Sequence, residues 1–435
     1  MQLTPDTEGY DDERTGFQRR AAHRPEMIFG VTDESDVRAA VEYAAARGLP
    51  VAVQASGHGL GAAMTGGVLI STRRMAGVRV DPAARTAWVE AGATWQHVIE
   101  AAAPHGLAPL SGSAPGVGAV SYTLGGGVGL LARQYGFAAD HVRRLDLVTA
   151  DGQTRRVTAA GEPDLFWALR GGGGGFGVVT GMEIDLMPVA GLYGGGLYFD
   201  VEQTPDVLAG WRRWTETVPR ELTSAVATLP FPDAPMVPEP LRGKYVAQVQ
   251  IAYTGTAEEG RELVEPLRAL GVPLRDSLHD LPYVESGAVF EEPERPAAYL
   301  SSNRLVDGLD PVATLPKLAG PSAGAICVVA LRHLGGALAE PPAVPNAVGH
   351  RAAAYSLTVL SPVEEGAADT VRATHGRILE PWAPHVLGRS LNFSFDLLDA
   401  EEVGTAFAPA DHRRLVALKN QHDPDGRIHA NHPLA

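Results

Sequence analysis

The sequence predicts a protein of two α+β domains, and three observations lead to this fold class. The chain has 435 residues, which is more than one hydrophobic core usually organises. Before Pro188, glycine-rich loops alternate with short strands and helices. After Pro188, glycines become rare, and the pattern is one of alternating strands and longer amphipathic helices, typical of an antiparallel sheet backed by helices. A domain boundary is therefore expected near residue 190.

Composition and charge favour a small-molecule partner. The net charge of −15 lacks the basic surface that nucleic acid or an anionic membrane requires. No segment has the roughly 18 uncharged apolar residues that span a bilayer, and the start of the chain lacks the apolar core of a secretory signal. The single cysteine, Cys327, lies in an apolar run and fits a buried thiol in a reducing compartment. We therefore predict a cytoplasmic protein with neither nucleic acid nor membrane as a partner.

The elements of the first domain follow from local patterns. Apolar residues three and four positions apart predict an amphipathic helix, and short apolar runs bounded by glycine and proline predict strands. The expected elements are a helix over 33–47, strands over 49–53 and 67–71, a hairpin over 78–91, a helix over 95–104, a hairpin over 142–157, a helix over 163–169 and a strand over 177–186.

The second domain shows period-two alternation. In the run over 244–253, Tyr245 and Tyr253 fall on one face and Gln248 and Gln250 on the other. The remaining expected elements are strands over 192–201, 325–334, 351–360 and 390–395, helices over 206–218, 256–269 and 363–379, a proline-rich loop over 229–240 and a last helix over 412–420.

A loop of small residues surrounds one histidine directly after the strand over 49–53. Its sequence is Gln54-Ala-Ser-Gly-His-Gly59, with His58 as the only large side chain apart from Gln54. Glycine allows the turn conformations that aim several backbone N–H groups at phosphate oxygens. The loop therefore predicts close contact with a phosphate-containing ligand, beside which the imidazole projects.

Two further glycine clusters follow, at 111–130 and 171–177. Gly127, Gly129 and Ala132 formally match a dinucleotide fingerprint, but the hairpin expected downstream is not a βαβ unit. In the later cluster a helix precedes a strand, the reverse of the order that the fingerprint requires. Three glycine loops separated by other elements instead predict one extended ligand, a dinucleotide, that lies across several loops.

These motifs resemble the FAD-linked oxidases of the berberine-bridge-enzyme-like group, in the vanillyl-alcohol-oxidase or PCMH-type superfamily. The resemblance rests on the His58 loop and on the segments 117–136, 164–179 and 418–431. It implies a two-domain PCMH-type fold with FAD as cofactor and an antiparallel-sheet substrate domain. The expected ranges are 1–190 for the first part of the FAD-binding domain, 191–401 for the substrate domain and 402–435 for a return segment that completes the FAD-binding domain.

By the same resemblance, His58 matches the histidine that bonds covalently to the flavin 8α-methyl carbon. The position that often carries a second covalent link, a cysteine, is Ala114 here, so a single link is expected. This is the pattern of 6-hydroxy-D-nicotine oxidase-like and EncM-like members. A tyrosine that often acts in catalysis matches Ser390, so a catalytic base must come from elsewhere.

The expected site residues fall into two groups. Predicted cofactor contacts besides His58 come from the three glycine loops and the return segment: Gln54, Ala55, Ser56, Gly57, Gly59, Leu60, Ser113, Ala114, Val117, Gly118, Ser121, Tyr122, Gly125, Gly127, Gly129, Leu130, Gly177, Val179 and Asn431. Candidates for a catalytic role are Tyr122, Tyr245, Tyr253, His333 and Asn392. His429 and His432 lack a supporting carboxylate pair, so no metal site is predicted.

The resemblance implies an oxidase of a small organic, secondary-metabolite substrate. A substrate carbon would give a hydride to flavin N5, and dioxygen would accept the electrons. One alternative is an EncM-like oxygenase that acts on a polyketide-like substrate. An alternative of another class is a nucleotide-binding protein without redox chemistry.

Overall fold

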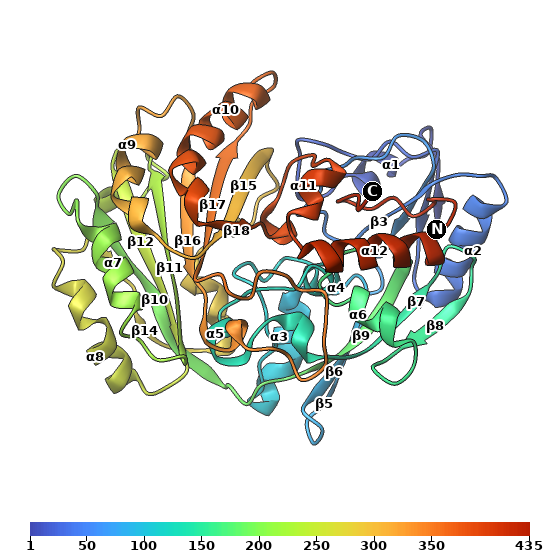
Figure 1. Ribbon diagram of the computed structural model, residues 1–435, viewed down its shortest axis with the longest axis horizontal. Helices are drawn as coiled ribbons and strands as arrows, with labels where there is room; N and C mark the ends of the chain where they lie inside the picture. The colour runs from blue at the N-terminus through green and yellow to red at the C-terminus, as the bar shows by residue number, and fades with distance from the viewer.

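The computed structural model describes residues 1–435, which form three β-sheets with flanking helices (Figure 1). The first sheet has the order β1 (Gln2–Leu3), β2 (Met27–Gly30), β4 (Val68–Ser71), β3 (Val51–Gln54). Its strands are parallel except β1. Helix α2 (Glu34–Ala45) packs on it through Val37, Ala40 and Val41 and begins where the Asp33 carboxylate accepts the Asp36 N–H.

The second sheet is antiparallel, with the order β5 (Val78–Asp81), β6 (Thr86–Glu90), β9 (Val178–Asp185), β7 (Val142–Val148), β8 (Thr154–Val157). Helices α3 (Trp95–Ala102), α4 (Ala119–Leu124), α5 (Ala132–Tyr135) and α6 (Pro163–Ala168) connect its strands. Both predicted hairpins are present. The later glycines of the second cluster, including Gly127 and Gly129, follow helix α4 and no strand, which excludes a Rossmann-type βαβ unit there.

The third sheet is antiparallel throughout and has nine strands. They are β10 (Gly191–Asp200), β11 (Leu222–Pro230), β12 (Tyr245–Tyr253), β13 (Arg275–Asp276), β14 (His279–Pro282), β15 (Tyr299–Val306), β16 (Val328–His333), β17 (Tyr355–Pro362) and β18 (Val386–Gly388). Figure 1 shows α7 (Val207–Thr215), α8 (Ala257–Arg268) and α9 (Leu315–Ala319) on the side of this sheet away from the two smaller sheets. Helix α10 (Ala368–Leu379) packs against β15 and β17.

One predicted strand is wrong. The residues expected as a strand over 390–395 form a short 3₁₀ turn over Leu391–Phe393. The side chain of Asn303 explains the turn, because it accepts the Ser390 N–H and donates to the Ser390 carbonyl oxygen. These bonds replace the ladder that a strand would need.

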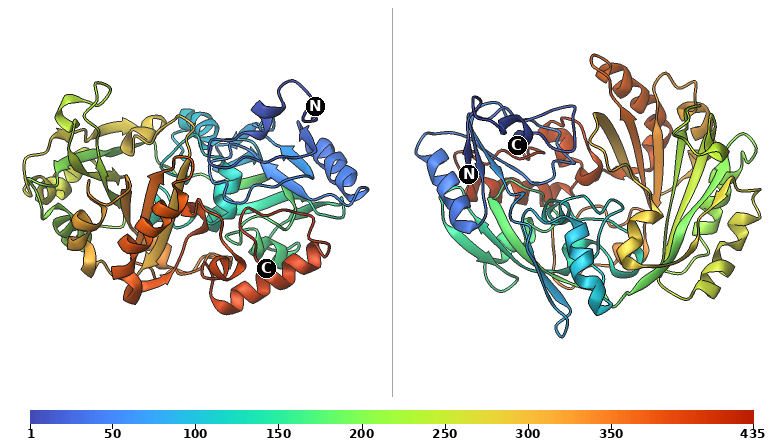
Figure 2. Two further views of the ribbon diagram at one scale, coloured as in Figure 1. Left: turned by 90° about the horizontal axis from the view of Figure 1, so that it is seen from above. Right: turned by 180° about the vertical axis from the view of Figure 1, so that it is seen from behind.

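The chain returns to the first half of the molecule at its end. After α11 (Ala400–Gly404) and α12 (Pro409–His422), the Val51 N–H donates to the Arg427 carbonyl and the His429 N–H to the Val51 carbonyl, so this segment runs beside β3. Both termini lie in this half (Figure 2).

The cores divide the chain in the same way. The largest apolar cluster draws on residues 87–192, on 391–434 and on a few side chains between, whereas the second largest spans 193–382. The ranges 1–190, 191–401 and 402–435 stay a prediction that this arrangement supports. None of the helices has the length and apolar character of a bilayer-spanning segment.

Candidate functional site

His58 lies in the loop after β3 with its ring stacked on Phe17. The two ring centroids are 4.0 Å apart and the planes differ by 12°. The Nδ1 atom is 2.8 Å from the Ser56 hydroxyl oxygen, and Nε2 has no hydrogen-bond partner. Burial lowers the pKa of His58 from 6.5 to about 4. The imidazole is therefore neutral at pH 7, oriented on one side and free to react on the other.

The backbone of the same loop carries unused hydrogen-bond donors. The N–H groups of the five residues from Ser56 to Leu60 donate to no acceptor in the protein. The loop is tight, because a Cβ on Gly57 (φ +69°) would lie 2.6 Å from the Gly16 Cα. Consecutive free N–H groups in a tight loop form a binding site for an anionic group such as a pyrophosphate. The loop therefore fits FAD.

The second glycine loop joins the His58 loop through Gly118, whose N–H donates to the Ser56 hydroxyl at 3.2 Å. Gly118 precedes helix α4, and the Ser121 hydroxyl donates to its carbonyl. The Tyr122 ring lies between the backbones of Gly112 and Gly127. A Cβ added at Gly112 would lie 2.9 Å from the ring, and one added at Gly127 would lie 2.4 Å from it. The Tyr122 hydroxyl is buried without a partner.

Asn431 fastens the return segment to the His58 loop. Its Nδ2 donates to the Gly59 carbonyl at 2.6 Å, and its Oδ1 accepts the N–H groups of Gly61 at 2.7 Å and Ala62 at 3.2 Å. The predicted cofactor residue Asn431 is thus a clamp on the loop that carries His58.

Replacing Asn431 with alanine is expected to destabilise the protein by about 1–3 kcal/mol, because three backbone groups lose their partner. FAD content per chain should fall as the loop loosens. Asn431→Asp keeps the acceptor oxygen, so its stability and FAD content are expected to lie between those of the wild type and those of Asn431→Ala. Thermal unfolding and the flavin-to-protein absorbance ratio measure both effects. Full FAD content in Asn431→Ala would contradict the role of the clamp.

The third sheet meets these loops with one of its faces. The Tyr299 hydroxyl donates to the His58 carbonyl at 2.7 Å, and Arg332 Nη2 donates to the Ser113 hydroxyl at 3.1 Å. Asn392 Nδ2 donates to the Tyr122 carbonyl at 2.8 Å. Side chains from the second half of the chain thus contact both glycine loops.

Three predicted catalytic residues lie on the other face of that sheet, which packs on helices. The Tyr253 hydroxyl donates to Glu259 on α8, and Tyr245 is part of the core under the helices. His333 stacks on Tyr355, whose hydroxyl bonds Thr215 on α7. The sheet stands between these side chains and the FAD loops. The predicted catalytic role of Tyr245, Tyr253 and His333 therefore lacks the contact with the FAD loops that it requires, whereas Asn392 contacts Tyr122 in the second glycine loop.

The other predicted cofactor residues divide into loop and core positions. Leu130 and Val179 are buried in the largest apolar cluster, and Gly177 lies against the backbone of β7. Gln54 is buried, and its Nε2 donates to the Arg14 carbonyl. Five further predicted contacts lie in the His58 loop or in the second glycine loop and stay predictions: Ala55, Ala114, Val117, Gly125 and Gly129.

Sequence reasoning missed Arg332 and Tyr299. The run over 325–334 is predicted as a strand, and alternation places the Arg332 and His333 side chains on opposite faces of it. That signal distinguishes the two faces without showing which of them meets the cofactor loops.

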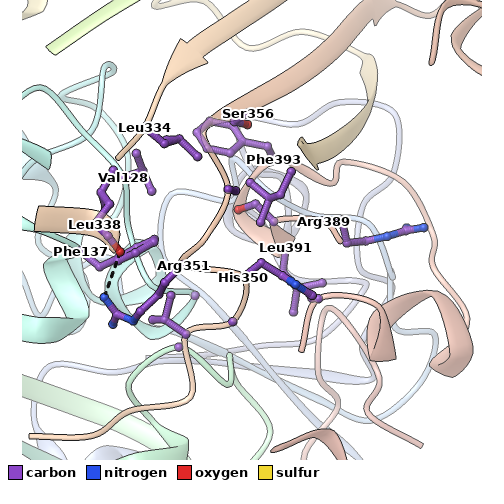
Figure 3. Close-up of a pocket in the computed structure, with 18 of the residues that line it drawn as sticks. Val128, Phe137, Leu334, Leu338, His350, Arg351, Ser356, Arg389, Leu391 and Phe393 are labelled. Carbon is purple, nitrogen blue, oxygen red and sulfur yellow. Dashed lines mark hydrogen bonds between the residues drawn. The ribbon is translucent and has the colours of Figure 1, made fainter. Parts of the chain in front are cut away.

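A small cavity of about 50 Å³ lies where the second glycine loop meets the third sheet (Figure 3). Its lining includes Gly127 and Val128 from the glycine loop and Ser356, Ser390 and Phe393 from the second half of the chain. The Ser356 Oγ atom is buried without a hydrogen-bond partner. Ser390, where a tyrosine was expected from the resemblance, therefore borders open space beside the glycine loop.

Known proteins resemble this chain over almost its whole length. Residues 25–158 match the family described as FAD binding domain. An FAD-linked oxidoreductase of Dictyostelium discoideum is 26% identical over 92% of this chain and 86% of its own. The (R)-6-hydroxynicotine oxidase of Paenarthrobacter nicotinovorans is 27% identical over 99% of this chain and 96% of its own. The chain is an FAD-dependent oxidase.

Solved structures show the same fold for this oxidase. The 6-hydroxy-D-nicotine oxidase from Arthrobacter nicotinovorans superposes with a TM-score of 0.86 at 24% identity, covering 100% of this chain and 97% of that one. The BBE-like 1 protein of Physcomitrella patens, as the D396N variant, gives 0.85 at 20% identity with the same coverage. The predicted two-domain PCMH-type α+β fold is confirmed.

Proposed function

We propose that this oxidase holds FAD through a single covalent bond from His58 and oxidises a small organic molecule with dioxygen as electron acceptor. The observation that carries the proposal is the neutral His58 imidazole with a free Nε2, set in a loop of free N–H groups. Ala114 offers no thiol for a second link, and the lone cysteine, Cys327, is buried in the other core. That single, reduced thiol also supports a cytoplasmic location.

When bound, FAD would supply the redox chemistry, namely hydride acceptance from the substrate and electron transfer to dioxygen. The residues of the chain would bind the cofactor and orient the groups around it. The N–H groups of residues 56–60 would hold the pyrophosphate, and Ser56 fixes the imidazole by its bond to Nδ1. Tyr299, at the start of β15 in the third sheet, holds the backbone of His58 through its hydroxyl.

Acid denaturation tests the covalent link. Denatured, washed wild-type protein is expected to stay yellow and to yield one flavin-bearing peptide that contains His58. His58→Ala should lose the bound flavin completely on denaturation, because no other nucleophile replaces it. His105→Ala, which changes an exposed histidine outside the glycine loops, serves as the control and should keep the flavin. A colourless wild-type polypeptide would sink the covalent proposal.

The oxidase reaction is tested by its products. One molecule of hydrogen peroxide is expected for each molecule of substrate oxidised. The predicted oxygenase alternative would instead leave oxygen in the product and peroxide below that ratio. The relatives are named oxidoreductases and an oxidase, which disfavours the non-redox alternative.

A further inference from the structure

The face of the third sheet that meets the FAD loops has an unusual composition. Strand register places Gln250, Ala225, Arg332 and Ser356 side by side across four strands. The neighbouring row contains Gln248, Ala227, Ala330 and Thr358. Alternate residues of the same strands, such as Val249, Val226, Leu331 and Leu357, form the core under the helices. The alanines at the centre of the two rows thus form a shallow part of the sheet surface, bordered by polar side chains.

Arg332 is the one cation in these two rows, and it is held in an apolar setting. Its side chain is 14% exposed, and its guanidinium lies 4.6 Å from the Phe290 ring centroid and 5.1 Å from that of Phe393. It donates one hydrogen bond, to the Ser113 hydroxyl, and lies 3.6 Å from Glu292 Oε1. A guanidinium has five N–H donors, so most of its hydrogen-bonding capacity is unused.

Two buried hydroxyls beside Arg332 are also without partners. Ser356, its cross-strand neighbour, is 3% exposed and lines the cavity in Figure 3. The Tyr122 ring lies against Gly112, the residue before the Ser113 that Arg332 bonds, and its hydroxyl is buried without a partner. Buried polar groups in proteins are nearly always hydrogen-bonded. Two buried hydroxyls without partners, near a guanidinium that makes one hydrogen bond within the protein, indicate a ligand with acceptor oxygens.

We infer that Arg332 recognises an anionic oxygen of the substrate, a carboxylate or an ionised phenol, on a molecule with a planar apolar body. The inference rests on the proposed function, since it names the substrate class of that same site. Arginine pairs with carboxylates through two parallel hydrogen bonds, and the rings of Phe290 and Phe393 border the position with apolar surface. The Glu292 carboxylate, 3.6 Å from Arg332, competes with the anionic substrate for the guanidinium charge.

Equilibrium binding to the FAD-loaded protein tests the inference with benzoate and its neutral isostere benzamide as probes. Calorimetry at pH 7 is expected to show benzoate binding at least about tenfold more tightly than benzamide. 4-Nitrophenolate, compared with nitrobenzene at pH 8, reports the phenol arm. Arg332→Gln should remove the preference for the anion, and Arg332→Lys should keep part of it because a point charge remains.

Two further variants sharpen the result. Glu292→Gln should tighten benzoate binding, because the competing carboxylate is gone. Arg377→Gln, which removes the same charge from α10 on the other side of the sheet, should bind benzoate as the wild type does.

Equal binding of benzoate and benzamide to the wild type, or an unchanged preference in Arg332→Gln, would overturn the inference. So would loss of FAD from Arg332→Gln and Arg332→Lys, which would assign the guanidinium to the cofactor. Calorimetry needs neither turnover nor a covalent flavin. Failure of the proposed covalent link or of peroxide formation is therefore seen separately, in the denatured protein and in the product analysis.

Discussion

Substitution of Gly129 by alanine is expected to abolish FAD loading. A Cβ at this position would lie 1.8 Å from the Ser111 carbonyl oxygen and 3.1 Å from the Tyr122 hydroxyl. The first of these is a backbone atom, so relief of the clash requires the backbone at Ser111 or at Gly129 to move. Overpacking of this kind typically costs about 1–3 kcal/mol, and here the displaced backbone is part of the predicted cofactor cradle.

Flavin absorbance per polypeptide after purification measures the effect, together with thermal unfolding. Gly174→Ala is the matched control from the third glycine cluster, because a Cβ there meets nothing within 4 Å. It should load FAD as the wild type does. Gly129→Ala protein that retains a full complement of FAD would show that the contact between residues 111 and 129 is not needed for binding.

Acidification from pH 6.5 to pH 4 is expected to unfold the protein. Burial lowers the pKa of His23, His375 and His432 to about 4 and that of His333 to about 3, from 6.5. Below pH 6.5 the unfolded chain therefore binds more protons than the native one, and stability falls as pH falls. Each such histidine contributes a slope of about 1.4 kcal/mol per pH unit. Over about two pH units four such histidines together remove about 11 kcal/mol, which is comparable with the whole stability of an ordinary domain.

Urea unfolding at a series of pH values measures this slope. His375→Gln keeps a side chain able to bond Ser361, which His375 Nε2 contacts at 2.9 Å, and should lower the slope by about 1.4 kcal/mol per pH unit. His105→Gln changes an exposed side chain and should leave the slope as it is. Stability that stays constant between pH 6.5 and pH 5 would contradict the prediction.

Local patterns were sufficient for much of the FAD-binding half. The helix expected over 33–47 and the hairpins around residues 82 and 152 are present because their signals lie within a few residues of one another. The His58 loop was recognisable for the same reason: the small residues that free its N–H groups are adjacent in sequence.

The substrate half was predicted less well, because its chemistry depends on partners far apart in the chain. Alternation placed Tyr245 and Tyr253 on one face, but only the packing of α7 and α8 shows that this face is covered. The place of Arg332 beside the second glycine loop is shown by its hydrogen bond to Ser113, which is 219 positions away in the chain. The turn at Ser390 likewise depends on Asn303, whose side chain no local pattern near residue 390 reveals.

The attachments of the His58 loop set the order in which the protein can mature. Phe17 stacks on the ring, Tyr299 holds its carbonyl, and Asn431 holds the residues that follow. These contacts come from the beginning, the middle and the last few residues of the chain. A ribosome-bound chain that lacks its final segment cannot complete the loop. The proposed attachment of flavin at His58 would therefore follow the docking of the segment that carries Asn431, and a chain without that segment would remain without a tethered cofactor.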